Sequence, residues 1–86
     1  MIIREASECD YYYILSLINN ELGYPDVTLE ELRLKIARMK KSGNYFIFVA
    51  LVDDETVGFI GVVQEMALEI QNDYFRIIEL AVSKAY

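Results

Sequence analysis

The second half of the chain contains three apolar runs separated by turn signals, an arrangement typical of a small antiparallel sheet. Residues 45–52 are all apolar and rich in β-branched and aromatic side chains, which is typical of a buried strand. The Asp-Asp-Glu sequence at 53–55 predicts a hairpin turn, and residues 56–64 then form the returning strand. A further turn signal at 72–73 precedes a last strand over residues 74–82. Because consecutive strands joined by short turns pair antiparallel, these runs predict neighbouring strands of one sheet.

The start of the chain predicts a strand followed by a helix. Residues 1–6 form the strand, and Ser7 caps the helix, with Asp10 at the spacing of a capping box. The apolar face of this helix consists of residues at helical intervals, namely Tyr11, Ile14, Leu15, Ile18 and Leu22. Gly23 suits the left-handed position that ends the helix.

A second helix is predicted between Thr28 and Gly43. Thr28 caps it with Glu31 as the reciprocal partner, and Gly43 ends it. Its apolar stripe is Leu29, Leu32, Ile36 and Met39. The order is therefore β-α-α-β-β-β, a single α+β domain over residues 1–86 with an antiparallel four-stranded sheet and two helices.

Two places in the strand region leave room for irregular structure. Gly58 and Gly61 have no side chain to pack, which predicts a bulge or a closely approaching neighbour in the third strand. Residues 66–71 read either as the tail of that strand or as a loose connection to the next one.

Composition excludes several classes of function. The net charge is −6 and no basic stripe is interleaved with aromatic residues, which argues against nucleic acid as the main partner. No stretch is long and apolar enough to span a membrane. With no histidine and one cysteine, the chain cannot build Ser-His-Asp or Cys-His nucleophiles or the usual zinc sites, so we expect no metal. A lone cysteine forms no internal disulfide, which favours a reducing cytoplasm.

Five segments, in order and spacing, resemble the GNAT (Gcn-related N-acetyltransferase) superfamily. They are Ile-Ile-Arg-Glu-Ala at 2–6, Asp10 followed by Ile14, Leu17 and Ile18, Glu-Leu-Gly-Tyr-Pro at 21–25, Val-Gly-Phe-Ile-Gly at 57–61 and Ile-Glu-Leu-Ala-Val at 78–82. The last segment looks like the family's fourth strand. In the family, that strand runs into a loop of the type Arg-Gly-x-Gly-x-Gly, whose amides hold the pyrophosphate of acetyl-CoA.

The resemblance implies acetyl transfer from acetyl-CoA, the family's co-substrate, to an amine. Residues 1–86 match the N-terminal half of the family fold and contain no such glycine-rich loop. We therefore expect a truncated form that is inactive alone and does not bind acetyl-CoA tightly. The acceptor amine stays open.

Site residues follow from the same resemblance. In the family, the amide matching Leu80 points at the thioester carbonyl and the backbone matching Val82 pairs with the pantetheine arm, so the backbone of Leu80, Ala81 and Val82 is the candidate cofactor-binding element. Strand alternation places Leu80 and Val82 on one face and Ala81 on the other. Plain core packing explains the same three residues without a ligand.

Glu79 is the candidate general base, because some family members use a glutamate of the fourth strand in this role. The alternatives are a solvated residue or a partner for Arg76, although strand alternation predicts Arg76 on the other face. Glu21 and Tyr24 are candidate substrate-binding residues, since the family's inter-helix turn lines the acceptor pocket; a simple helix stop explains them equally.

Other notable residues have structural explanations. One or two rings of the Tyr-Tyr-Tyr sequence at 11–13 can face the core, and the rest cover a rim or an interface. We expect Cys9 to be an inert, partly buried thiol and the acidic turn at 53–55 to be solvated.

A rival interpretation is a non-catalytic α+β dimerisation or binding module. The last strand would be an open sheet edge, and such edges recruit other chains. We expect a homodimer, or a partner that completes the sheet edge, joined through this strand or through the sheet face that further helices cover in the family.

Overall fold

The computed structural model describes all residues from Met1 to Tyr86. Its elements are β1 (Ile2–Glu5), the 3₁₀ turn η1 (Glu8–Asp10), α1 (Tyr11–Asn20), α2 (Leu29–Ser42), β2 (Tyr45–Val52), β3 (Glu55–Glu65) and β4 (Tyr74–Val82). The predicted order β-α-α-β-β-β is confirmed, with one short 3₁₀ turn added before α1. The last strand has the predicted bounds, and residues 66–73 are a loose connection rather than strand.

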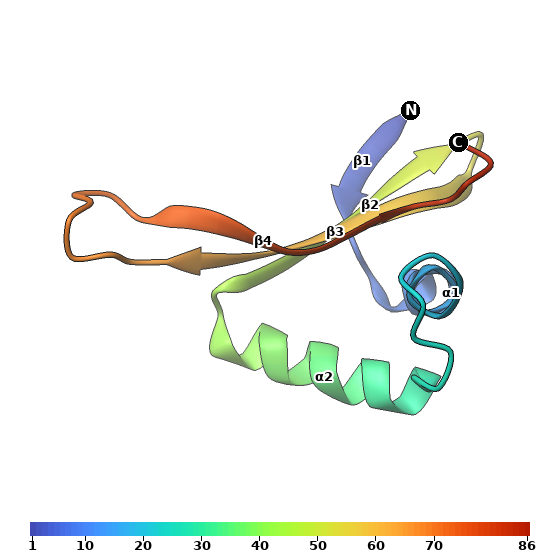
Figure 1. The fold of residues 1–86 in the computed structure, drawn as a ribbon, viewed down its shortest axis with the longest axis horizontal. Helices are drawn as coiled ribbons and strands as arrows, with labels where there is room; N and C mark the ends of the chain where they lie inside the picture. The colour runs from blue at the N-terminus through green and yellow to red at the C-terminus, as the bar shows by residue number, and fades with distance from the viewer.

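The sheet is antiparallel throughout, in the order β1-β2-β3-β4, so β4 is an edge strand. Both helices lie on one side of it and none lies on the other (Figure 1). The end of the β3–β4 hairpin projects beyond the helices on the left of Figure 1. Neither helix is long and apolar enough to cross a membrane.

The entry to α1 is tied to the end of β1 by Asp10. Its carboxylate accepts from the Ser7 backbone N–H at 2.8 Å, as the predicted capping box requires, and from the Arg4 guanidinium at 2.7 and 2.9 Å. Asp10 is buried, and the Arg4 hydrogen bonds hold its pKa below the ordinary value in spite of that burial. This contact fixes where the first helix leaves the sheet.

Local signals also set the ends of α2 and the β2–β3 turn. The Thr28 hydroxyl accepts from the Glu31 backbone N–H at 3.2 Å, and Gly43 ends the helix with a φ of 83°. Asp53 and Asp54 have φ values of 50° and 64°, so they form the two-residue turn with positive φ at both positions that matches the twist of a hairpin.

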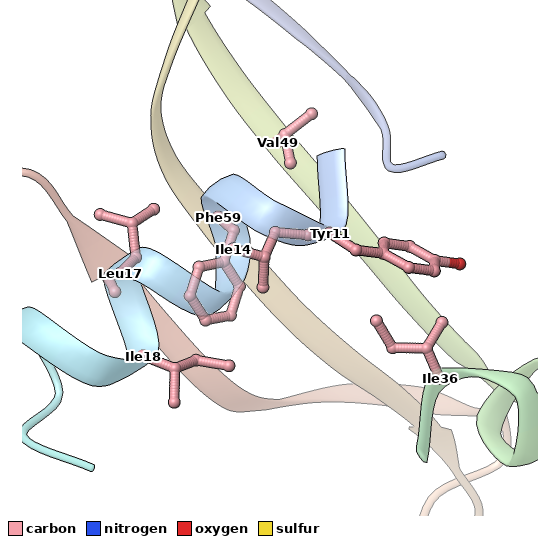
Figure 2. Packing of buried hydrophobic residues seen from close by; sticks show 8 residues of the cluster. Tyr11, Ile14, Leu17, Ile18, Ile36, Val49 and Phe59 are labelled. Carbon is pink, nitrogen blue, oxygen red and sulfur yellow. The ribbon is translucent and has the colours of Figure 1, made fainter. Parts of the chain in front are cut away.

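The core lies between the helices and the sheet (Figure 2). It consists of Tyr11, Ile14, Leu17, Ile18, Ile36, Val49, Phe59 and Ala81. The predicted face of α1 is wrong at one position, because Leu17 is buried and Leu15 is only half-buried. Helical spacing alone admits either residue, and the contact of α1 with both α2 and the sheet rotates the inward face towards Leu17.

The register shifts once on each side of β3. Val57 is the extra residue against β2, beside Gly58, and Ile78 is the extra residue of β4, opposite Gly61. A Cβ at Gly58 would lie 3.0 Å from the Ala81 carbonyl oxygen, and one at Gly61 would lie 3.3 Å from Ile78 Cγ1. Both the predicted bulge and the predicted close neighbour are therefore present at these glycines.

The bulge at Ile78 corrects the prediction that Arg76 and Glu79 lie on opposite faces. Arg76 is paired with Val63 and Glu79 with Gly61, and those two β3 positions share a face. Simple alternation fails because one extra residue reverses the pattern of the strand beyond it.

Two smaller expectations concern the first turn of the helix region. Cys9 is exposed rather than partly buried, because η1 carries it on the outside of the Ser7–Asp10 turn. Tyr11 is buried, whereas Tyr12 and Tyr13 are exposed and contact each other edge to face at 5.5 Å between centroids, as helical spacing predicts.

Candidate functional site

A groove of about 590 Å³ runs between α2, the turn that joins the two helices, and β4. Its lining residues are Ile18, Leu22, Tyr24, Val27, Glu31, Leu32, Lys35, Ile78 and Glu79. We call it the α2–β4 groove. Apolar side chains form its floor, and charged or hydroxyl groups come from three different elements, which is the usual make-up of a small-molecule site.

Glu79 reaches this groove because of the bulge in β4. The extra residue puts both Ile78 and Glu79 among the groove lining on the helix side, and Gly61 opposite Glu79 has no side chain to fill the space. Glu79 is exposed and takes part in none of the three ion pairs of the structure. Its carboxylate therefore has no charged partner within the chain.

Arg76, the alternative partner of Glu79, is engaged elsewhere. Its Nε donates to Glu65 Oε1 at 2.9 Å, and the Tyr74 hydroxyl donates to the other oxygen of the same carboxylate at 2.8 Å. The Arg76 hydrogen bond lowers the pKa of Glu65, with a smaller contribution from Tyr74. Glu65 and Asp10 are thus structural carboxylates held by arginines, and neither lines the α2–β4 groove.

Of the two predicted turn residues, Tyr24 lines the groove and Glu21 does not. Tyr24 is held by its carbonyl oxygen, which accepts from Asn19 Nδ2 at 2.8 Å. Glu21 Oε1 instead accepts from the Lys84 backbone N–H at 3.4 Å, which ties the inter-helix turn to the exit of β4. The structure brings Tyr24 and Glu79 into one groove and leaves Glu21 beside its end.

Glu31 and Lys35 also line the groove, although they were not among the predicted site residues. They are four residues apart on α2 and flank Leu32, so they lie along the border of the apolar stripe. This spacing of four residues is the only feature of the sequence that could have indicated a site here, and it is common on solvated helix faces.

The free edge of β4 presents backbone groups of Leu80 and Val82. The Ser83 N–H donates to the Val57 carbonyl oxygen at 2.7 Å, so the backbone of Ser83 faces β3. Ala81, two residues before Ser83, is paired with Phe59 and faces β3 in the same way. Because hydrogen-bonded and non-bonded pairs alternate in an antiparallel ladder, the N–H and C=O groups of Leu80 and Val82 point away from β3. The Ala81 side chain is buried in the core, whereas Leu80 and Val82 are exposed on the opposite face, as predicted.

This edge fits the thioester and pantetheine part of acetyl-CoA, which the family resemblance implies as co-substrate. An extended amide-containing arm can pair with outward-facing N–H and C=O groups in the manner of an added strand. The glycines of the chain, at 23, 43, 58 and 61, form no glycine-rich loop after β4 that could hold a pyrophosphate. No group of His, Cys, Asp or Glu side chains is arranged to hold a metal ion.

No family model matches the chain, and no curated protein matches it. Solved structures do. A GNAT family acetyltransferase from Staphylococcus aureus superposes with a TM-score of 0.83 at 21% identity, over 99% of this chain and 64% of that one. An acetyltransferase from Vibrio fischeri gives 0.62 at 26% identity, over 100% and 72%.

An aminoglycoside 6′-N-acetyltransferase from Acinetobacter haemolyticus gives a TM-score of 0.73 at 14% identity, over 99% of this chain and 59% of that one. The chain thus spans about three-fifths of the length of most of these neighbours. These superpositions confirm the resemblance predicted from the sequence: the chain has the β-α-α-β-β-β part of the GNAT acetyltransferase fold.

Proposed function

We propose that this chain forms the acceptor side and the acetyl-binding edge of a GNAT N-acetyltransferase, which moves an acetyl group from acetyl-CoA to an amine. One juxtaposition carries the proposal. Glu79 projects into the α2–β4 groove, and the next residue, Leu80, turns its N–H to the free edge of the same strand. A proton acceptor and an oxyanion donor therefore lie one residue apart, on two sides of the place where amine and thioester would meet.

The chemistry follows from these positions. The amine nitrogen attacks the thioester carbon, and negative charge develops on the carbonyl oxygen, which the Leu80 N–H stabilises. Glu79 takes the amine proton directly or through a water molecule. The carbon–sulfur bond then breaks, the acetyl group stays on nitrogen, and the leaving thiolate takes up a proton from solvent water. Tyr24 contacts the acceptor from the helix side of the groove.

Residues 1–86 supply one part of this machinery, so we propose that they are inactive alone and hold acetyl-CoA weakly. Glycine-rich amides at a helix N-terminus make the pyrophosphate contacts in this family, and the chain has no such element. A cytoplasmic location belongs to the same proposal, because the single cysteine, Cys9, forms no disulfide.

The test is Glu79→Gln in a version of the chain extended to the length of the GNAT neighbours. Loss of a general base lowers kcat by about 10²–10⁴-fold, while the affinity for acetyl-CoA stays close to that of the parent. Glu31→Gln is the matched control, since it removes a carboxylate from the same groove but away from β4. Unchanged turnover of Glu79→Gln across the pH range would assign the proton transfer to another group.

A non-catalytic dimerisation or binding module is the second candidate. The observation that favours it is the unpaired edge of β4 next to a sheet face that no helix covers (Figure 1). The nucleotide sequence downstream of the codon for Tyr86 separates the two candidates. A reading frame that continues into Arg-Gly-x-Gly-x-Gly favours the enzyme, and an immediate stop codon favours the module.

A further inference from the structure

Lys35 is the only cation among the residues that line the α2–β4 groove. It comes from α2, whereas Glu79 comes from β4. Both residues also line a smaller cavity of about 50 Å³, which adjoins the groove and reaches Phe59 in the core. Lys35 and Glu79 therefore border the same two hollows from the two elements that form their walls.

Neither of these two charges is neutralised within the chain. The three ion pairs of the structure all involve arginines, and neither Lys35 nor Glu79 takes part in one. The two side chains also do not form an ion pair with each other. A positive and a negative group that border one space and lack partners are complementary to a ligand that carries both charges.

The second carboxylate of the groove, Glu31, is already engaged. The Thr28 hydroxyl donates to Glu31 Oε1 at 3.1 Å and accepts from the Glu31 backbone N–H at 3.2 Å, as part of the N-terminal cap of α2. A ligand cation that paired with this carboxylate would compete with the cap. The groove therefore offers one unpaired cation and one unpaired carboxylate, which argues against a diamine as the acceptor.

The rest of the groove is mainly apolar. Its floor is formed by side chains from both helices and β4, namely Ile18, Leu22, Leu32 and Ile78. Its volume of about 590 Å³ is typical of a small-molecule site. Because removal of apolar surface from water is favourable, this floor suits an apolar group on the ligand.

We propose that the acceptor is an α-amino acid with an apolar side chain, whose carboxylate pairs with Lys35 while its amine lies at Glu79. This inference rests on the proposed function, in which the groove holds the acceptor amine. An α-amino acid carries its amine and its carboxylate on one carbon, so its site needs a proton acceptor and a cation that border the same space. Lys35 and Glu79 are such a pair. An ammonium group and a carboxylate form a charge-assisted hydrogen bond, which fixes the orientation of the amine.

A comparison of two acceptors tests the proposal in the chain extended to the length of the GNAT neighbours. Leucine and isopentylamine share the side chain and the amine, but isopentylamine has no carboxylate. We expect kcat/KM to be roughly 10–100-fold higher for leucine, as for other hydrogen bonds between charged groups. A kcat/KM for isopentylamine, or for the linear diamine cadaverine, that equals or exceeds the value for leucine would overturn the proposal and leave the acetyltransferase function intact.

Lys35→Gln assigns the effect to one side chain. It should raise the KM for leucine roughly 10–100-fold and leave kcat/KM for isopentylamine unchanged, because that amine has no group for Lys35 to bind. Lys35→Arg should keep most of the preference for leucine. Lys41→Gln is the matched control, since it removes a cation from the last turn of the same helix, outside the groove. An equal loss for both acceptors in Lys35→Gln would contradict a contact with the carboxylate.

Calorimetric titration of the extended chain with leucine, with and without coenzyme A, separates this inference from the proposed function. Saturable binding that Lys35→Gln weakens, without acetylation of any amine, would support the amino-acid site and refute the transferase function. Acetylation of isopentylamine without saturable leucine binding would overturn the amino-acid site alone. The absence of both leucine binding and acetylation would overturn both.

Discussion

Replacing Asp10 with alanine should destabilise the protein by about 2–3 kcal/mol. The substitution removes the acceptor of the Ser7 N–H and of two Arg4 hydrogen bonds at a site that is almost fully buried. Loss of an N-terminal cap costs about 1 kcal/mol, and hydrogen bonds to a charged group contribute about 1.5–3 kcal/mol. For the Arg4 hydrogen bonds we take the lower end of that range, because the Arg4 side chain is 40% exposed and binds water once Asp10 is removed.

This loss is a large fraction of the protein's total free energy of unfolding. A domain of this length has a free energy of unfolding of roughly 4–13 kcal/mol. Urea unfolding at pH 7, followed by circular dichroism, measures the difference between the parent and Asp10→Ala. Glu8→Ala is the control, because Glu8 lies in the same turn as Asp10 but makes only an exposed 3.5 Å ion pair, with Arg33 of α2. We expect no measurable change in the free energy of unfolding for this variant.

The pH dependence of Asp10→Asn provides a second readout. The folded-state pKa of Asp10 lies below its unfolded value, chiefly because of the Arg4 hydrogen bonds. The folded state therefore binds fewer protons between the two pKa values, and stability rises with pH there. The advantage of the parent over Asp10→Asn is complete above about pH 5 and shrinks as the pH falls below about 4, towards the folded pKa. An advantage of less than about 0.5 kcal/mol at pH 7, or one independent of pH, would refute the assignment of Asp10 as the tie between β1 and α1.

Four further predictions concern the glycines and the cofactor. Gly58→Ala should cost about 1–3 kcal/mol in urea unfolding, because its Cβ would lie 3.0 Å from the Ala81 carbonyl oxygen, which cannot move without the strand. Gly61→Ala should cost less, since its Cβ meets the Ile78 side chain at 3.3 Å and that side chain can rotate; equal costs would contradict this difference. Gly43→Ala should cost about 1 kcal/mol, because φ there is 83°, and an unchanged midpoint would argue against that geometry. Calorimetric titration of residues 1–86 with acetyl-CoA should give no saturable binding at low micromolar concentration, because the chain has no glycine-rich pyrophosphate loop, and saturable binding would reject that reasoning.

Local patterns in the sequence predicted the elements of this fold almost completely. The bounds of β2 and β4, the cap at Thr28 and the stop at Gly43 all appear where residue type and spacing placed them. The turn predicted over 53–55 is one residue shorter, because Glu55 pairs with Val52 as the first residue of β3. Each of these depends on interactions within a few residues of the chain, such as a side chain bonding an amide three positions on, or a backbone angle that few residues adopt.

The site was predictable in its residues but not in its assembly. Glu79 and the backbone of Leu80 and Val82 were selected by family resemblance, and the structure places the first in a groove and the others at a free edge. Glu31 and Lys35 joined that groove without any distinctive sequence signal, because a helix border residue becomes part of a site only through the element that packs opposite it.

The sequence by itself determined where the helices and strands lie, because caps, turns and hydrophobic period act over short distances along the chain. Only the tertiary structure decided the orientation of α1 towards Leu17 and the bulge at Ile78, which turns Arg76 and Glu79 to one face against the simple alternation. It also decided which sheet face the two helices cover (Figure 1). The physical reason is that these features depend on the register between neighbouring strands and on packing between elements, where partners far apart in sequence select among arrangements that the local pattern permits equally.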